Sequence, residues 1–578
     1  RNGFIIAIGP LANATAAREI DARGMFVAPG FINIHSHASP DGLPAAVNML
    51  TQGVTTEIFN ADGNGPLDIP QQMTTLAASG LAVNIGGYIG FNAAWANVVG
   101  NTDRRPTADE IERMRGLISS GLARGAWGVS AGLDYKPGYF ARTEEVIQVV
   151  DVARPARTNF TNHDRITPES NYSSKVGVSE TVAIGMKSGM VPVITHMKAQ
   201  GHEQGTADDL LASMAAATKR GYYTAADAYP YLAGQSGLGA LIIPGWALEG
   251  GRPEMLKRFA DPATRAKIIA EAERAMTARF GGPQGVYLPR TEQELTAVMK
   301  EMNAGAGETV LRILEQGDTG AILRFGSEED LVNILKDPIT SMACDCGATV
   351  ATRGMHPRFY GSYPRLLGRY VREQKIMTWE QAIRKSTWLP AATIGMTDRG
   401  LLAPGMAADV VVFDPATVID RATYQNPGLR SEGIHFVMVN GVVALDRGEP
   451  TGARGGKALL RSMDMPSRPV NDEQRGLRVE ASAMKDGSSI EIDLTHRRGA
   501  RQATGTLKAS GLFEIERLGV LETANGWAHV TGIDKRGRAI DVIVDLHNPD
   551  AREPALVVRI DGEIAYGGGL PASRITIR

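Results

Sequence analysis

Apolar residues follow two different spacings along this chain, and the change between them indicates its architecture. From residue 31 to about 395, short apolar runs of strand length alternate with segments whose apolar residues recur at helical spacing, such as 107–124, 143–153 and 208–220. Eight such units predict an α/β protein with a (β/α)8 barrel, whose reactive groups lie at the C-terminal ends of the strands. The eight predicted strands are 31–37, 54–59, 83–89, 126–133, 157–163, 191–196, 222–229 and 340–345.

The regions on both sides of this predicted barrel (31–395) carry β patterns. Short β-like runs separated by turns predict a small β-sandwich domain built from residues 1–30 and 396–465, and a separate all-β domain over 470–578. A long, charged, helical stretch at 247–335 interrupts the last barrel unit, and we expect this insertion to cover one side of the barrel. The runs assigned to the small domain are 4–8, 25–34, 410–413 and 436–443.

Composition excludes several classes of function. The formal net charge of −2 gives no electrostatic case for binding nucleic acid or an anionic membrane, and no apolar stretch is long enough to span a bilayer. The two cysteines, Cys344 and Cys346, are separated by one residue, a poor geometry for a disulfide, so we expect them to pack without a bond. We expect a cytoplasmic protein. A secreted or periplasmic location stays open because the chain starts with Arg1, and a homo-oligomer stays open as well.

Imidazole and carboxylate groups follow the predicted strands at the end where a barrel places its chemistry. His35-Ser36-His37 closes the first strand, and side chains two residues apart on a strand project from the same face. Two neutral imidazoles side by side suit a divalent transition metal. Four histidines and two carboxylates at such positions are enough for two ions that share one oxygen ligand. They are His35, His37, Asp62, His163, His196 and Asp345.

Several longer segments occur in a specific order and spacing together with these residues. They include Val27-Ala28-Pro29-Gly30-Phe31-Ile32-Asn33-Ile34-His35-Ser36-His37, Gly53-Val54-Thr55-Thr56, Gly132-Leu133-Asp134-Tyr135-Lys136-Pro137-Gly138, Thr195-His196-Met197-Lys198, Asp227-Ala228-Tyr229-Pro230-Tyr231 and His356-Pro357-Arg358. In this arrangement the chain resembles the amidohydrolase superfamily and, within it, the N-acyl-D-amino-acid deacylase (D-aminoacylase) family. The resemblance covers about residues 5–455 and leaves the C-terminal β region outside.

The resemblance implies a zinc-dependent enzyme that hydrolyses a linear amide, above all an N-acyl-D-amino acid, to a carboxylate and a D-amino acid. It implies that His163, His196 and Asp62 hold a tightly bound zinc ion. His35 and His37 would belong to a second, weaker site. Asp345 would lie beside the activated water as general base and then general acid.

The chain departs from the family pattern in several places, among them Ala38-Ser39, which replaces a frequent polar or acidic pair. Asp62 stands where relatives usually carry a bridging cysteine or glutamate, and its shorter arm is expected to alter metal spacing and affinity. Asn33 replaces the aspartate that is common before His-x-His. Many members of the superfamily bridge two metals with a carbamylated lysine from the fourth strand. Lys136, just beyond that strand, is the nearest candidate here, although a loop lysine is more often solvated.

The resemblance also implies a small-molecule amide substrate that is anchored by four side chains. Lys198, Tyr229 and Tyr135 would bind its carboxylate or carbonyl oxygen, since a cation and phenolic donors suit such groups, and Arg358 would add a planar fork. Solvated loop cations and packed tyrosines are the ordinary alternative. Two other functions stay open, namely a cyclic-amide hydrolase similar to hydantoinases or dihydroorotases, and a non-catalytic barrel with a binding role.

Overall fold

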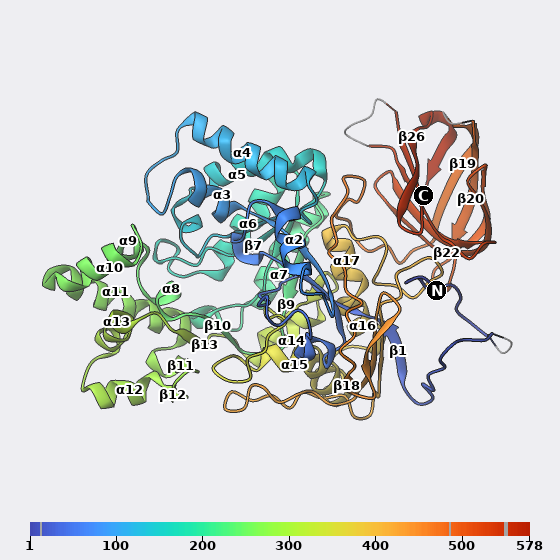
Figure 1. The fold of residues 1–578 in the computed structure, drawn as a ribbon. Coiled ribbons are helices and arrows are strands. Elements are labelled where there is room, and N and C mark those ends of the chain that lie inside the picture. Colours follow the sequence, from blue (N-terminus) through green and yellow to red (C-terminus); the bar gives the residue numbers. More distant parts are fainter. Residues whose placement is uncertain (12–13, 485–486, 548–552) are drawn as a thin grey trace.

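The computed structural model describes residues 1–11, 14–484, 487–547 and 553–578 (Figure 1). Its largest part is a barrel of parallel strands in two sheets, with strand orders β2-β3-β4 and β14-β9-β8-β7-β6-β5. All eight predicted strands are found, and the run predicted at 83–89 is split at Tyr88 into β4 and β5. The strands are β2 (Phe31–Asn33), β3 (Val54–Phe59), β4 (Asn84–Gly87), β5 (Ile89–Gly90), β6 (Val129–Gly132), β7 (Asn159–His163), β8 (Val191–Ile194), β9 (Ala225–Ala228) and β14 (Thr340–Met342).

The barrel closes where the segments that follow β2 and β14 meet. Ser36 forms an isolated parallel bridge with Cys346, and the amide of His37 donates to the carbonyl of Cys346 at 3.0 Å. Regular pairing of β2 therefore ends at Asn33, four residues before the end of the predicted strand. The side chain of Asn33 takes over the contact there: its Oδ1 accepts from the amide of Cys344 at 3.1 Å, and its Nδ2 donates to the carbonyl of Cys346 at 3.2 Å.

Helices pack around the outside of the strands. The predicted helices at 107–124, 143–153 and 208–220 are found as α4 (Ala108–Ala123), α5 (Thr143–Val150) and α7 (Ala207–Lys219). α4 begins where predicted because Thr107 and Glu110 form a capping box, which satisfies amides that the first turn leaves unpaired. The core between helices and strands is apolar and closely packed, with Trp95, Phe91 and Phe160 fully buried.

A helical insertion leaves the barrel between β9 and β14. It starts with β10 (Ala233–Gly237), earlier than the predicted residue 247, because β10 pairs with β13 (Gly320–Arg324) at its far end. Between these strands the insertion has its own apolar core and lies to the side of the barrel (Figure 1). Its other elements are α8 (Leu238–Ile242), α9 (Gly245–Leu248), α10 (Arg252–Ala260), α11 (Pro262–Phe280), β11 (Val286–Leu288), β12 (Gln293–Glu294), α12 (Leu295–Met302) and α13 (Ala306–Gln316).

A small sheet combines the two flanks of the barrel in the order β1-β15-β16-β17-β18. The run predicted at 436–443 is a hairpin rather than one strand, because Asn440 and Gly441 adopt positive φ angles and turn the chain. The run predicted at 4–8 forms only an isolated bridge from Phe4 to Ala407, since it lies against a loop instead of a strand. The strands are β1 (Phe26–Pro29), β15 (Val410–Phe413), β16 (Ile434–Val439), β17 (Val442–Asp446) and β18 (Glu449–Pro450).

In the part of it that the structure describes, the C-terminal module is a nine-stranded antiparallel sheet beside the barrel, with its own core (Figure 1). Two ion pairs join it to the rest of the molecule: the partly buried Arg157 pairs with Asp545, and the buried Arg468 with Glu522. In the described ranges, no helix combines the length and apolarity needed to cross a bilayer. The strands are β19 (Arg475–Ala483), β20 (Ser489–His496), β21 (Thr504–Ser510), β22 (Phe513–Ala524), β23 (Trp527–Asp534), β24 (Ala539–Asp545), β25 (Ala555–Ile560), β26 (Glu563–Gly569) and β27 (Ile575–Ile577).

Candidate metal centre

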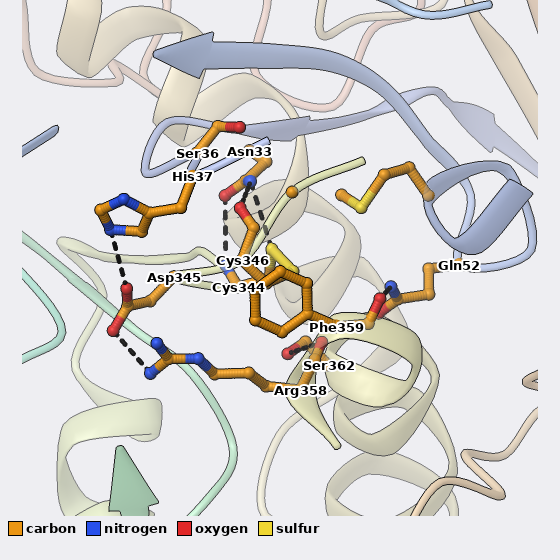
Figure 2. Close-up of a disulfide and its surroundings, with 12 residues drawn as sticks. Asn33, Ser36, His37, Gln52, Cys344, Asp345, Cys346, Arg358, Phe359 and Ser362 are labelled. Carbon is orange, nitrogen blue, oxygen red and sulfur yellow. Dashed lines mark hydrogen bonds and ion pairs between the residues drawn. A yellow bond between two sulfur atoms is a disulfide. The ribbon is translucent and has the colours of Figure 1, made fainter. Parts of the chain in front are cut away.

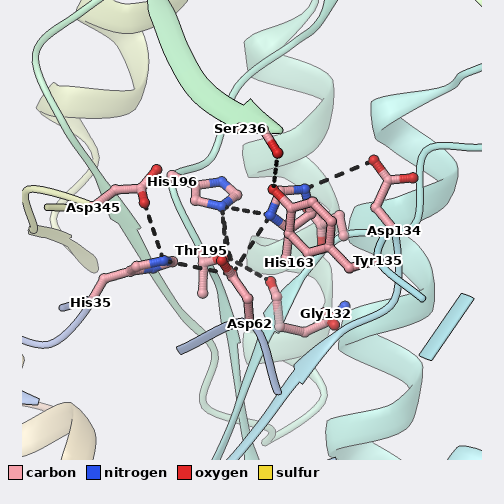
Figure 3. A network of polar contacts seen from close by, with 12 residues as sticks. His35, Asp62, Gly132, Asp134, Tyr135, His163, Thr195, His196, Ser236 and Asp345 are labelled. Atoms are coloured by element: carbon pink, nitrogen blue, oxygen red, sulfur yellow. Dashed lines mark hydrogen bonds and ion pairs between the residues drawn. The ribbon is translucent and has the colours of Figure 1, made fainter. Parts of the chain in front are cut away.

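The structure brings the six predicted ligands together at the C-terminal end of the barrel. Figure 3 shows five of them, and His37 is seen beside Asp345 in Figure 2. They come from the ends of five strands or from the residues that follow them, although up to 310 positions separate them in the chain. Their ligand atoms form three overlapping groups, each with all atoms within 4.8 Å of one another. The groups are His35, His37 and Asp62; His35, His196 and Asp345; and Asp62, His163 and His196.

Asp62 lies between the two pairs of histidines. Its Oδ1 is 3.6 Å from Nε2 of His35 and 3.6 Å from Nδ1 of His163, and its Oδ2 is 3.4 Å from Nε2 of His37. Asp62 reaches this place from a tight turn after β3, where its φ is +58°. Gly132 leaves room for that turn, because a Cβ there would lie 2.5 Å from the carbonyl oxygen of Asp62. One carboxylate therefore lies within 3.6 Å of a histidine from each pair.

Asp345 faces the same cluster from the opposite side. Its Oδ1 is 3.2 Å from Nε2 of His37 and 3.5 Å from Nε2 of His35. Its Oδ2 accepts a hydrogen bond from Nη1 of the buried Arg358 at 2.7 Å. One oxygen thus points at the ligands while the other is held by a guanidinium, which fixes the orientation of the carboxylate.

Polar atoms at the centre of the cluster lie near one another but outside hydrogen-bonding distance. Both ring nitrogens of His35 and Oδ1 of Asp62 are buried and form no hydrogen bond with any residue that the structure describes. Such orphaned atoms are costly in a protein interior unless another group satisfies them. A donor set of imidazole nitrogens and carboxylate oxygens is one that zinc accepts. These residues therefore fit a zinc site.

The electrostatics of the cluster keep its carboxylates ionised. Burial by itself raises the pKa of Asp62, but His35 and the other imidazoles around it outweigh that effect and hold the pKa well below its usual value. Burial likewise opposes ionisation of Asp345, and Arg358 and His35 reverse the effect, so its pKa is also well below normal. Burial, assisted by Lys198 and His163, lowers the pKa of His196, which keeps it neutral. Ionised carboxylates and a neutral imidazole are the forms that bind metal. Burial lowers the pKa of His35 and His37, but Asp345 and Asp62 outweigh it and raise both, so a metal ion held by these two histidines would have to displace their protons.

Cys344 and Cys346 form a disulfide, so the expectation that they pack without a bond is wrong (Figure 2). The reason lies in the residue between them. Asp345 has a φ of +49°, and this left-handed turn brings the two Cα atoms to 5.0 Å, within the range that a disulfide spans. Nδ2 of Asn33 also contacts Sγ of Cys344 at 3.2 Å. The disulfide and Asn33 together hold the backbone on both sides of Asp345.

The four predicted substrate anchors line the same cavity as the cluster, a space of about 1010 Å³. Nζ of Lys198 donates to the hydroxyl of Tyr229 at 2.8 Å, and the guanidinium of Arg358 lies over the Tyr229 ring at 4.8 Å. The ring of Tyr135 packs against His163 at a tilt of 54°, with ring centroids 4.4 Å apart, and its hydroxyl accepts a hydrogen bond from Ser236 at 3.3 Å. Burial lowers the pKa of Lys198 to about 7. An anion in this part of the cavity would favour its charged form.

Lys136 also lines the cavity, but its amine is directed elsewhere. Nζ of Lys136 lies 4.3 Å from the centre of the Tyr139 ring. Burial lowers its pKa to about 8, against the opposing effect of Asp134. The oxygen that lies between the histidine pairs is that of Asp62, as described above. In the described part of the chain, the amine of Lys136 therefore contacts Tyr139 and belongs to none of the three groups of candidate ligands.

Sequence reasoning missed the carboxylates that stand behind the histidines. Oδ2 of Asp227 is 3.7 Å from Nδ1 of His35, and its Oδ1 accepts from the amide of His196 at 2.7 Å. Oδ2 of Asp134 is 3.8 Å from Nε2 of His163. Asp134 directly follows the predicted strand 126–133, and Asp227 lies two residues before the end of the predicted strand 222–229; both are inside the segments quoted for the family resemblance. That position was the available signal.

Comparisons with known proteins identify the family of this chain. The model of the amidohydrolase family matches residues 202–445. A D-aminoacylase from Alcaligenes xylosoxydans xylosoxydans is 31% identical over 492 residues, which cover 80% of this chain and 93% of that protein. The structure is similar to that of N-acyl-D-glutamate deacylase from Bordetella bronchiseptica in complex with zinc and a phosphonate that mimics the tetrahedral intermediate. The TM-score is 0.66 at 30% identity, and the match covers 80% of this chain and 94% of that one.

A dihydropyrimidinase from Brevibacillus agri shares the fold alone, with a TM-score of 0.52 at 14% identity over 81% of this chain and 95% of that one. The barrel predicted from the strand–helix pattern is therefore confirmed, and so is the family resemblance. The cyclic-amide enzymes are the more distant group. By sequence and by structure, this chain belongs to the amidohydrolase family, in the group of the N-acyl-D-amino-acid deacylases.

Proposed function

We propose that this protein is a zinc-dependent hydrolase that cleaves an N-acyl-D-amino acid to a carboxylate and a D-amino acid. The observation that carries the proposal is that a cluster of metal ligands and a pair of side chains suited to binding a carboxylate line the same cavity. Three overlapping groups of metal ligands lie at one end, and the hydrogen-bonded pair of Lys198 and Tyr229 lies beside them. The names of the relatives support the linear amide and the D configuration.

We assign the tightly bound zinc to His163, His196 and Asp62, and a second, weaker site to His35 and His37, with Asp62 as the shared ligand. The short distances from Asp62 to both histidine pairs support this assignment. Zinc held there would act as a Lewis acid: it would polarise the amide carbonyl and lower the pKa of a bound water to about 7.

Asp345 is the general base in this proposal. Its Oδ1 faces the ligand cluster, so it can accept the proton of the attacking water and then deliver it to the leaving nitrogen. Arg358 keeps Asp345 ionised and turned toward the cluster. An amide nitrogen leaves poorly unless it is protonated, and the proton that Asp345 delivers allows it to leave as an amine.

Lys198 and Tyr229 bind the substrate carboxylate, and Tyr135 the oxygen of the scissile carbonyl. Tyr135 packs against His163, one of the proposed zinc ligands, which supports a role next to the reacting carbonyl. Lys198 and Tyr229 already share a hydrogen bond, so their donors converge on one point. A carboxylate at that point would pair with the ammonium and the phenol together. This geometry favours an acylamino acid over a neutral cyclic amide.

The test is a substrate screen on metal-stripped protein that is reconstituted with zinc. N-acetyl-D-amino acids, their L enantiomers and hydantoins are compared, with His163→Ala as the inactive variant and His202→Ala, at an exposed histidine, as the matched control. Zinc-restored, D-selective deacylation in the control but not in His163→Ala supports the proposal. Opening of hydantoins without deacylation favours a cyclic-amide hydrolase, and hydrolysis of neither substrate by zinc-loaded protein favours a binding role.

A further inference from the structure

The end of helix α11 brings a buried cation from the insertion to the rim of the barrel. Arg279 is only 3% exposed, and its guanidinium reaches three acceptors. Nη2 is 2.7 Å from Oδ2 of Asp134 and 3.4 Å from Oε1 of Gln200, and Nη1 donates to the carbonyl of Ile166 at 3.3 Å. These acceptors lie on the segments that follow β8, β7 and β6. One side chain of the insertion therefore joins three loops that carry or flank candidate ligands.

The backbones approach as closely as the side chains. Gly201, in the segment after β8, lies so near to α11 that a Cβ there would be 1.9 Å from the carbonyl oxygen of Ala278. The φ of Gly201 is +54°, which also favours glycine. The insertion is thus seated directly on the loops of the candidate metal centre, and Arg279 lies at this seat.

The carboxylate that Arg279 binds stands behind a proposed zinc ligand. Nδ1 of His163 faces the cluster, 2.9 Å from Nε2 of His196 and 3.6 Å from Oδ1 of Asp62 (Figure 3). The opposite nitrogen, Nε2, faces Oδ2 of Asp134 at 3.8 Å. The other oxygen of Asp134 accepts from the amide of Ile166 at 3.3 Å. Arg279 and Ile166 thus hold Asp134 with one oxygen toward the imidazole.

We propose that Arg279 is a positioning residue for the metal centre: it fixes the carboxylate of Asp134, which orients His163, and so couples zinc affinity to the docked insertion. A carboxylate behind a ligating histidine sets the tautomer and ring orientation and raises the basicity of the ligand. An arginine suits this task because its planar fork can bind several acceptors at fixed angles. The inference rests on the zinc site of the proposed function.

The alternative is a purely structural brace between insertion and barrel, and zinc affinity separates the two. The variants are Arg279→Met, Arg279→Lys and Asp134→Asn. The matched control is Arg265→Met, on the same helix, whose guanidinium pairs with Glu308 and Glu315 inside the insertion. The zinc dissociation constant is measured by competition with a chromophoric chelator, together with the thermal midpoint of the metal-free protein.

We expect Arg279→Met and Asp134→Asn each to weaken zinc binding by about 10- to 100-fold, as loss of such supporting groups does in other zinc sites. The variant that combines Arg279→Met and Asp134→Asn should bind zinc no more weakly than the weaker-binding single variant, because both substitutions act through His163. Arg279→Lys, which keeps the charge but not the fork, should recover part of the affinity. The control should bind zinc like the wild type even if its thermal midpoint falls.

Wild-type zinc affinity in Arg279→Met with a lowered thermal midpoint would overturn the inference in favour of a brace. Should Arg279→Met not fold, Asp134→Asn decides, since it keeps the shape of the side chain: unchanged zinc affinity there overturns the inference, and weakened affinity supports it. A wild type that binds no zinc would overturn the proposed function as well. A wild type that binds zinc and deacylates, with variants of equal affinity, would overturn only the role of Arg279.

Discussion

His529 is a buried histidine whose charge we expect to stabilise the C-terminal module. It lies on β23 between two carboxylates: Nδ1 is 3.3 Å from Oε2 of Glu522 on β22, and Nε2 is 2.9 Å from Oδ1 of Asp541 on β24. Arg468 pairs with Glu522 and Arg559 with Asp541. Burial lowers the pKa of His529, but the two carboxylates outweigh it and raise the pKa from 6.5 to about 9.

The magnitude follows from that difference in pKa between the unfolded and the folded chain. Raising the pKa from 6.5 to about 9 corresponds to about 3 kcal/mol of folding free energy. Because the folded-state pKa of His529 is the higher one, the contribution is fully present below pH 6.5 and is lost as the pH rises through about 9. A neutral glutamine at the same place lacks the charge at every pH.

The assay compares thermal midpoints of the wild type, His529→Gln and the control His547→Gln, at an exposed histidine, between pH 6 and pH 10. We expect the gap between wild type and His529→Gln to be largest near pH 6 and to close toward pH 10. The control should follow the wild type throughout. A gap that is the same at all pH values would refute the reasoning, because the loss would then come from packing and not from charge.

Three other predictions concern the site. Asp345→Asn should retain zinc by metal analysis but lower kcat by about 10²- to 10⁴-fold, and near-normal turnover would remove Asp345 from acid–base catalysis. Lys198→Ala should raise KM for an acylamino acid far more than for a neutral amide of the same acyl group, whereas equal effects would exclude capture of the carboxylate. Replacing both Cys344 and Cys346 with serine should lower kcat more than it changes zinc content, because the turn that orients Asp345 loses its covalent link. Thiol alkylation of the wild type verifies the disulfide. An unaltered kcat would then show that Asn33 and Arg358 are enough to orient Asp345.

The barrel and the positions of its candidate ligands could be predicted from sequence because both leave local signals. A strand needs a short apolar run and a helix a 3.6-residue period, so the β/α alternation can be recognised without knowledge of contacts. Parallel strands in a barrel end at one rim, so polar residues such as His163 and His196 at strand ends are expected to meet. The prediction of helix α4 succeeded for the same reason, since its capping residues are neighbours in sequence.

The local sequence pattern gave wrong predictions where the backbone is not extended as in a strand, and where a single turn divides one apolar run into two paired strands. The interpretation of Cys344 and Cys346 assumed an extended strand, whereas the left-handed φ of Asp345 brings their Cα atoms to 5.0 Å. Apolar composition alone also merged a hairpin into one run at 436–443, although Asn440-Gly441 is a strong signal for a turn.

The sequence by itself determined the strand–helix order, the family and the residue types at the rim of the barrel, because periodicity and short motifs are properties of neighbouring residues. Only the tertiary structure decided which carboxylate stands behind which histidine. Arg279 and Asp134 meet across 145 positions of the chain, and Asn33 meets Cys344 across 311. Such contacts depend on how the insertion seats on the barrel and how the barrel closes, and neither of these leaves a periodic trace in the sequence.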